Sequence, residues 1–158
     1  SANERETLLA PVAAGRVGAL LAGATPEQEA ALAGYGMHLG TAFQIIDDVL
    51  DYSGDAATIG KSLGDDLAEG KPTLPLIYVM QHGNAEQAAC VRRAIEDGGR
   101  DDFAAVLAAI RATGALDHAK KCAEAEAALA AHSIECLPAS TYKDSLLELC
   151  LFAVARSF

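Results

Sequence analysis

Three aspartates, Asp47, Asp48 and Asp51, stand within five positions of the sequence, and Gln44 precedes them by three. On an α-helix this spacing brings all four side chains to one face, so a helix here carries three carboxylates and one amide. The carboxylates of Asp47 and Asp51 repel each other unless a cation lies between them. Mg²⁺ prefers oxygen ligands, takes one or two carboxylates and shares substrate phosphates. The spacing therefore indicates a magnesium site, and a solvated acidic face is the alternative.

A glycine-rich, charged segment follows the aspartates over residues 53–73 and contains Lys61 and Lys71. Loops of this length in compact domains are uncommon and usually functional. A lysine ammonium group is a point charge well suited to phosphate. The residues flanking the aspartates are strongly apolar, which buries the helix over most of its circumference. Together these features favour a magnesium–diphosphate site over a solvated acidic face.

The aspartates lie near the end of a long helix that the pattern predicts from Pro26 to Tyr52. Thr25 suits the N-cap of this helix, and Gln28 completes a capping box. Further helices are predicted over residues 3–22, 76–81, 84–97, 101–113, 115–137 and 141–157, with Asn84 and Asp101 as N-caps of two of them. Within the first, Pro11 either kinks the helix or marks its true start. No stretch alternates as a strand does, so the predicted fold class is all-α in one domain.

Composition limits the classes of function. The 158 residues are 51% hydrophobic and 22% charged, which suits one domain with a sizeable core. The net charge of -10 argues against nucleic acid as a partner, because such binding needs a basic surface. No apolar run reaches the roughly 20 residues of a transmembrane segment. Four cysteines in apolar, helix-like stretches, without a C-x-x-C pair, predict reduced thiols and a cytoplasmic location.

Residues 40–52, GTAFQIIDDVLDY, resemble the second aspartate-rich motif of the trans-isoprenyl (polyprenyl) diphosphate synthases. Residues 59–67 and 69–76 are similar to the stretch that follows this motif in the family, in the same order. The subgroup they resemble most is the bacterial octaprenyl synthases, which make the side chain of respiratory quinones such as ubiquinone. The resemblance implies an isoprenoid-synthase-type helical bundle, of which residues 1–158 form the carboxyl-terminal half. The family's first aspartate-rich motif would then lie upstream.

The resemblance also implies a reaction. An allylic diphosphate ionises to a carbocation, isopentenyl diphosphate attacks it, and the product is a polyprenyl, here octaprenyl, diphosphate. Mg²⁺ and lysines stabilise the departing diphosphate, and a dry apolar cavity protects the cation. By resemblance, the metal ligands are Asp47, Asp48 and Asp51; the substrate-binding residues are Thr7, Phe43, Gln44, Lys61 and Lys71; and the catalytic residues are Asp47, Asp48 and Lys61. Asp65 and Asp66 order the loop, and a part in metal binding is the alternative for them. The family's partners are the two diphosphates and a second copy in a homodimer.

One position departs from the family pattern. The Lys-Thr pair that contacts the allylic diphosphate in the family falls here on Glu6-Thr7, and Glu6 reverses the charge. Because the family's first aspartate-rich motif is missing from these residues, and Glu6 departs from the pattern as well, we expect this chain alone not to condense prenyl diphosphates. A non-catalytic helical partner subunit related to such synthases is the alternative, which Lys61 and Lys71 oppose. A simple magnesium- or calcium-binding module is a third reading, although no EF-hand spacing supports calcium.

Overall fold

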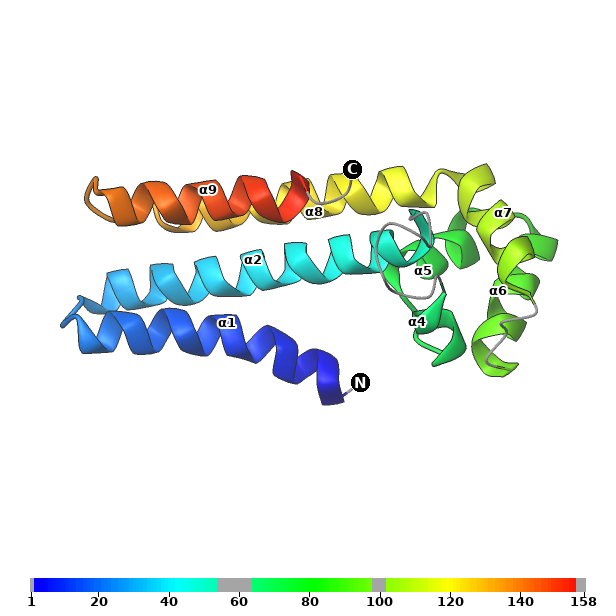
Figure 1. Cartoon of the computed structure of the whole chain (residues 1–158), viewed down its shortest axis with the longest axis horizontal. Helices are drawn as coiled ribbons and strands as arrows, with labels where there is room; N and C mark the ends of the chain where they lie inside the picture. Colours follow the sequence, from blue (N-terminus) through cyan, green and yellow to red (C-terminus); the bar gives the residue numbers. More distant parts are fainter. Residues whose placement is uncertain (1, 54–63, 98–101, 156–158) are drawn as a thin grey trace. The chain divides into compact units, whose positions relative to one another are not determined.

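The computed structural model describes residues 2–53, 64–97 and 102–155, and the side chains from residue 9 onward. Every regular element in these ranges is an α-helix (Figure 1), so the all-α prediction is confirmed. The chain forms two compact units. The first contains the residues up to 44 and from 122 onward, and the second contains residues 45–121. None of the described helices is long and apolar enough to cross a membrane.

The first unit consists of long helices. It contains α1 (Ala2–Leu21), most of α2 (Pro26–Ser53), the second part of α8 (Ala115–Ser133) and α9 (Thr141–Ala155). At the start of α2 the predicted capping box is present. The backbone N–H of Gln28 donates to Oγ1 of Thr25 at 3.3 Å, and that of Thr25 donates to Oε1 of Gln28 at 3.0 Å. The predicted helix over residues 26–52 is confirmed within one residue at its end.

Helices α1 and α2 approach each other closely at two glycines. A Cβ atom on Gly36 would collide with the backbone carbonyl of Pro11, and one on Gly15 would collide with that of Leu32. Pro11 lies inside α1, which begins at Ala2, so the interpretation of Pro11 as the helix start is wrong. Proline in a helix interior removes one backbone hydrogen bond. At this point α1 packs closely against α2. The missing side chain of Gly36 leaves room for the Pro11 carbonyl.

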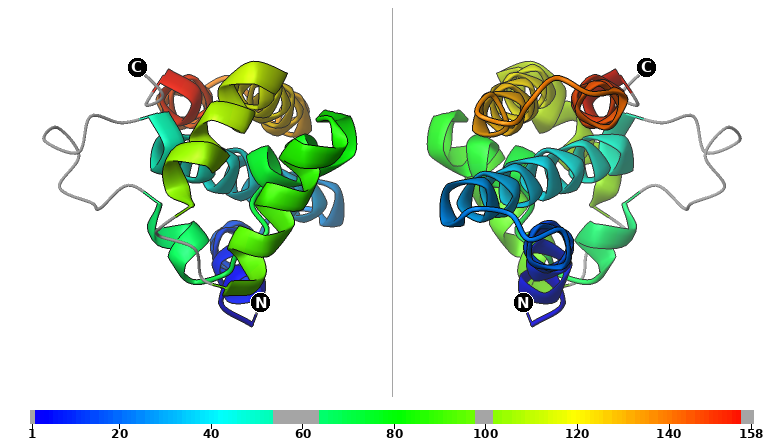
Figure 2. Two further views of the ribbon diagram at one scale, coloured as in Figure 1. Left: turned by 90° about the vertical axis from the view of Figure 1, so that its right-hand side faces the viewer. Right: turned by 90° about the vertical axis from the view of Figure 1, so that its left-hand side faces the viewer.

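Figure 2 views the helices of the first unit from their ends. The core of this unit is built mainly from small side chains, and its buried members are Tyr35, Ala42, Ala127, Ala130, Ile134 and Cys150. The hydroxyl of Tyr35 donates to the carbonyl of Leu146 at 2.8 Å, which ties α2 to α9. His38 Nδ1 lies 2.7 Å from Oε2 of Glu126, which ties α2 to α8. All four cysteines of the chain are free thiols, as predicted.

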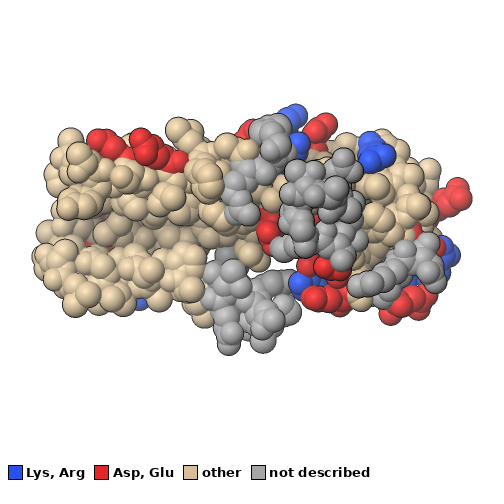
Figure 3. Space-filling model, viewed as in Figure 1, with Lys and Arg blue, Asp and Glu red and all other residues tan. Residues whose placement is uncertain are grey.

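The same unit leaves large apolar side chains in solvent. Leu21 of α1 is 85% exposed and Leu151 of α9 is 71% exposed, and Leu9, Leu20 and Phe152 are also exposed. In the view of Figure 3, much of the surface over α1 carries neither basic nor acidic residues, whereas acidic side chains lie over the first part of α9. Scattered exposed leucines are normal on a protein surface, but contiguous apolar patches mark interaction sites.

The second unit packs short helices around the end of α2. It contains α4 (Asp65–Ala68), α5 (Leu74–His82), α6 (Ala85–Asp97), α7 (Phe103–Thr113) and the start of α8. Buried Leu67, Leu76, Val79, Val91, Val106 and Ile110 form its core. The Asn84 cap of α6 is confirmed by reciprocal hydrogen bonds with Gln87. The N-cap of α7 is Asp102, whereas the predicted cap Asp101 lies outside the described residues.

The predicted helix ends were partly wrong. Helix α8 stops at Ser133, four residues before the predicted end at Leu137. The residues after it form turns in which Glu135 N donates to His132 O and Leu137 N donates to Ile134 O. The ammonium group of Lys143 holds these turns by donating to the carbonyls of Glu135 at 3.0 Å and Leu137 at 2.8 Å.

Candidate metal and diphosphate site

The aspartates lie on the part of α2 that belongs to the second unit. On this stretch Ile46 and Val49 are buried, whereas Asp47, Asp48 and Asp51 are only partly buried. The predicted amphipathic helix is therefore present, with its apolar side in the core and its carboxylates on one face. This arrangement shows how the sequence positions the carboxylates, because the buried residues fix the rotation of the helix.

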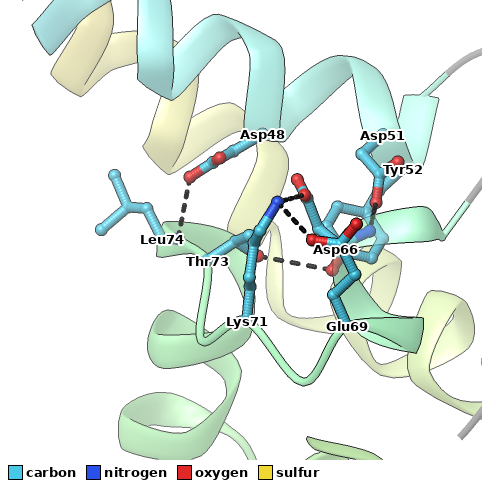
Figure 4. A network of polar contacts seen from close by, with 8 residues as sticks. All are labelled: Asp48, Asp51, Tyr52, Asp66, Glu69, Lys71, Thr73 and Leu74. Carbon is cyan, nitrogen blue, oxygen red and sulfur yellow. Dashed lines mark hydrogen bonds and ion pairs between the residues drawn. The ribbon is translucent and has the colours of Figure 1, made fainter. Parts of the chain in front are cut away.

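Two of the three carboxylates hold the segment that contains α4 and leads into α5. Asp51 Oδ2 accepts a hydrogen bond from the backbone N–H of Asp66 at 3.3 Å. Asp48 Oδ2 accepts one from the backbone N–H of Leu74 at 3.4 Å (Figure 4). These carboxylates therefore fix the position of the backbone that follows them in sequence.

Glycines give this segment its path. Gly64 has φ +79°, and a Cβ atom there would collide with the ring of Phe103. Gly70 has φ +69° and a Cβ atom would lie 2.9 Å from the carbonyl oxygen of Ile95. Left-handed backbone favours glycine because it has no Cβ. After Gly70 the chain turns back, and the N–H of Lys71 donates to the carbonyl of Asp66 at 2.9 Å.

This turn brings the Lys71 ammonium group to two carboxylates. Its Nζ lies 2.7 Å from Oδ1 of Asp66 and 2.9 Å from Oε2 of Glu69. The hydrogen bond to Asp66 is the main reason that the pKa of Lys71 is raised, followed by the one to Glu69. Lys71 therefore supplies positive charge to the cluster that Asp51 and Asp66 form (Figure 4). Its predicted contact with a diphosphate stays a prediction.

The ionised form of Asp51 is destabilised in this arrangement. Its pKa is raised from 3.8 to about 6, first by burial and then by the nearby Asp66 carboxylate, while the backbone N–H groups of Asp66 and Asp65 lower it. A buried carboxylate beside another carboxylate favours the neutral form unless a cation compensates. A positive ion bound next to Asp51 and Asp66 would therefore stabilise the ionised form of Asp51.

The donor set suits Mg²⁺ in kind. The site offers carboxylate oxygens, which this hard cation prefers, and no sulfur or imidazole ligand. Among the described residues, no group of three or more His, Cys, Asp and Glu side chains suffices to hold a metal ion. Mg²⁺ keeps several waters and binds through one or two carboxylates plus substrate phosphates, so an incomplete protein shell is the expected arrangement. The residues present therefore fit magnesium shared with a phosphate ligand.

The remaining predicted site residues divide into two groups. Phe43 and Gln44 are partly buried on α2, in the stretch that belongs to the first unit. Lys61 lies outside the described residues, and the side chain of Thr7 on α1 lies outside the described side chains. The structure therefore brings together Asp51 and Lys71 through Asp66, and Asp48 contacts the backbone of Leu74 at the start of α5.

Three residues of this region were not among the predicted site residues. Glu69 is the second partner of Lys71, and Tyr52 and Thr73 meet through their hydroxyl groups in the core. Thr73 had one signal in the sequence, a polar residue between Pro72 and the apolar start of α5. The sequence contained no such signal for Glu69 or Tyr52, because the path of the intervening chain determines which residues they contact.

Comparison with known proteins agrees with the sequence resemblance. Residues 7–113 match the polyprenyl synthetase family, and the chain belongs to this family. It is 52% identical to the octaprenyl diphosphate synthase of Haemophilus influenzae over 92% of this chain and 44% of that protein. It is 48% identical to the octaprenyl diphosphate synthase of Escherichia coli over 91% of this chain and 45% of that protein.

Solved structures show the same fold. A heptaprenyl diphosphate synthase from Staphylococcus aureus has a TM-score of 0.88 at 30% identity, covering 98% of this chain and 48% of its own. A polyprenyl synthase from Caulobacter crescentus, complexed with calcium and isoprenyl diphosphate, has a TM-score of 0.84 at 38% identity, covering 94% of this chain and 46% of its own. The chain thus spans less than half the length of these relatives, and the predicted bundle fold is confirmed.

Proposed function

We propose that this chain supplies one wall of the active site of a prenyltransferase that condenses an allylic diphosphate with isopentenyl diphosphate. The observation that carries the proposal is a set of contacts within the part of the chain that matches the polyprenyl synthetase family. Asp51 and Lys71 both bind Asp66, and Asp48 accepts a hydrogen bond from the N–H of Leu74. Octaprenyl diphosphate is the product we favour, because two relatives with about half of their residues identical bear that name. We further infer that both units belong to the carboxyl-terminal half of one synthase domain.

The residues have distinct roles in this proposal. Asp47, Asp48 and Asp51 bind Mg²⁺ directly or through water, while Gln44, Lys61 and Thr7 contact the allylic diphosphate. When bound, Mg²⁺ supplies electrostatic stabilisation of the departing diphosphate. The backbone bonds to Asp48 and Asp51 orient these carboxylates before the ligand arrives. Preorganised charge of this kind needs no rearrangement during the reaction.

An apolar pocket in the first unit supports the proposal that the substrate has a prenyl chain. It measures about 390 Å³ and is lined by Pro11, Gly15, Leu32, Tyr35, Leu39 and Leu146, among others. Its size is within the range of small-molecule sites. An isoprenoid chain is a flexible hydrocarbon, which an apolar lining of this kind accepts.

We propose that the 158 residues alone do not complete this site. The pattern D-D-x-x-D occurs once in the sequence, at residues 47–51, and the reaction in this family uses two aspartate-rich motifs. The exposed apolar residues of α1 and α9 are suited to contact with further polypeptide. Assembly as a homodimer stays a prediction, and so does a cytoplasmic location.

The alternative is a non-catalytic helical partner subunit. One relative, 31% identical over 98% of this chain, is named heptaprenyl diphosphate synthase component 2 of Geobacillus stearothermophilus. That name describes a protein that acts as one component of a larger enzyme. Glu6, in place of the family lysine, favours the alternative, whereas the aspartates and Lys71 favour a working site.

The deciding experiment supplies labelled farnesyl and isopentenyl diphosphates with Mg²⁺. We expect no elongated product from the 158 residues alone. We expect product after co-expression with the part of the Haemophilus influenzae synthase that has no counterpart in this chain. Elongation by the isolated chain would refute its incompleteness. A pair that forms a complex but yields no product, with or without Glu6→Lys, would favour the non-catalytic subunit.

A further inference from the structure

Tyr52 and Thr73 form a buried hydroxyl pair next to the aspartates. Tyr52 is 2% exposed and Thr73 is 6% exposed. The Thr73 hydroxyl donates to the phenol oxygen of Tyr52 at 3.4 Å, across 21 positions of sequence. The ring of Tyr52 is held in turn by Phe103, with ring centroids 6.3 Å apart and planes 17° from parallel.

The pair stands beside both carboxylate contacts (Figure 4). Tyr52 directly follows Asp51, and Thr73 directly precedes Leu74, whose N–H donates to Asp48. The two carboxylate–backbone distances, 3.3 and 3.4 Å, are longer than the usual 2.9–3.0 Å of such bonds. The Tyr52–Thr73 contact, at 3.4 Å, is also long for two hydroxyl groups, but both residues are buried, whereas Asp48 and Asp51 are partly exposed. It therefore adds a buried constraint to the two carboxylate–backbone bonds.

We propose that Tyr52 and Thr73 are positioning residues for the magnesium–diphosphate site. Their contact fixes the register of residues 64–74 against the end of α2. Asp48, Asp51 and Asp66 thereby keep their spacing in spite of mutual repulsion, and Lys71 stays beside them. This inference rests on the proposed function, because it assigns the register a role in binding. Groups behind the ligands of a metal site commonly set its affinity.

Calorimetry with Mg²⁺ and inorganic pyrophosphate tests the binding role. Thr73→Val and Tyr52→Phe remove one hydroxyl each at nearly constant volume, and we expect each to weaken binding about tenfold. Thr73→Ser keeps the hydroxyl and should stay within about twofold of the unchanged chain. Thr113→Val is the matched control, because it removes a threonine hydroxyl of the second unit that donates to the carbonyls of Ala109 and Ile110 in its own helix, and its affinity should stay unchanged. Unchanged affinity in Thr73→Val and Tyr52→Phe would overturn the proposal.

Amide hydrogen exchange without ligand tests the register directly. In Thr73→Val and Tyr52→Phe, the amides of Asp66 and Leu74 should exchange about tenfold faster, and in Thr73→Ser they should not. Unchanged exchange would refute the register contact. If the unchanged chain binds no Mg²⁺–pyrophosphate, the proposed function and the binding role both fall, while the exchange result still decides whether the contact sets the register.

Discussion

The contacts that stabilise the first unit internally differ in kind from those that stabilise the second. In the first, α1 meets α2 through backbone contacts at Gly15 and Gly36, and much of the core is alanine. In the second, carboxylates of α2 accept hydrogen bonds from the backbone of α4 and the start of α5, and a lysine bridges two acidic side chains. Both units have apolar cores, so these contacts are what distinguishes them. Substitutions at the glycine contacts should therefore change stability alone, whereas substitutions in the polar cluster should change ligand binding as well.

The largest effect should come from removing carboxylates in the second unit. The double variant Asp47→Ala, Asp48→Ala leaves Asp51 as the single aspartate of the stripe. We expect affinity for Mg²⁺ and a diphosphate analogue to fall at least about 100-fold, because each ion needs one or two carboxylates. Calorimetry measures this, and Glu124→Ala, which removes an exposed carboxylate of α8, is the control. Unchanged binding in the double variant would refute the site assignment.

In the first unit, Gly36→Ala should cost stability and spare binding. The added Cβ collides with the backbone carbonyl of Pro11, so α1 and α2 must separate. We expect the free energy of unfolding to fall by about 2 kcal/mol, as for other overpacked contacts. Urea denaturation measures it.

Gly18→Ala is the matched control for this prediction, because nothing lies within 4 Å of its added Cβ. Alanine is favoured over glycine inside a helix, so this variant should gain roughly 0.5–1 kcal/mol. A loss of magnesium–diphosphate affinity in Gly36→Ala without a loss of stability would break the contrast between the two units.

Local pattern predicted the elements well, because helix signals are local. The capping box of Thr25 and Gln28, the Asn84 cap and the amphipathic aspartate helix all follow from residues within one or two turns. Pro11 shows where local signals fail. Its helix-breaking tendency is overridden by packing against Gly36, which lies 25 positions away in sequence.

The contacts of the candidate site were less predictable. Spacing and resemblance predicted the aspartates and Lys71, but not that Lys71 lies between Asp66 and Glu69. That geometry depends on the left-handed turn at Gly70, which in turn lies against the carbonyl of Ile95. A pattern of residue types contains no information on such a long-range approach.

A smaller effect should follow from Lys71→Gln. This variant leaves Asp66 and Glu69 without their cation and increases the repulsion that Asp51 feels. Partly exposed ion pairs contribute modestly, so we expect a loss of about 1 kcal/mol in the absence of metal. Denaturation in EDTA measures this loss, and Mg²⁺ with pyrophosphate should restore part of it. Lys121→Gln, at an exposed position of α8, should change neither value; equal losses in the two variants would argue against a specific role for Lys71.

The smallest predicted effect concerns the charge of Asp51 and depends on pH. The folded-state pKa of about 6 lies above the ordinary 3.8, so the folded chain binds this proton more tightly than the unfolded chain. The resulting stabilisation is complete below about pH 4, is lost as the pH rises to about 6, and is absent above it.

The variant Asp51→Asn tests this dependence, because asparagine does not titrate and still accepts the hydrogen bond from Asp66. In EDTA its advantage over the unchanged chain should grow across that window and then level off below about 1 kcal/mol, after allowance for solvent screening. Denaturation curves at successive pH values measure the difference, with exposed Asp144→Asn as the control. Parallel curves for Asp51→Asn and the unchanged chain would show that Asp51 carries no such strain, and the second unit would then lose its strongest electrostatic reason to bind a cation.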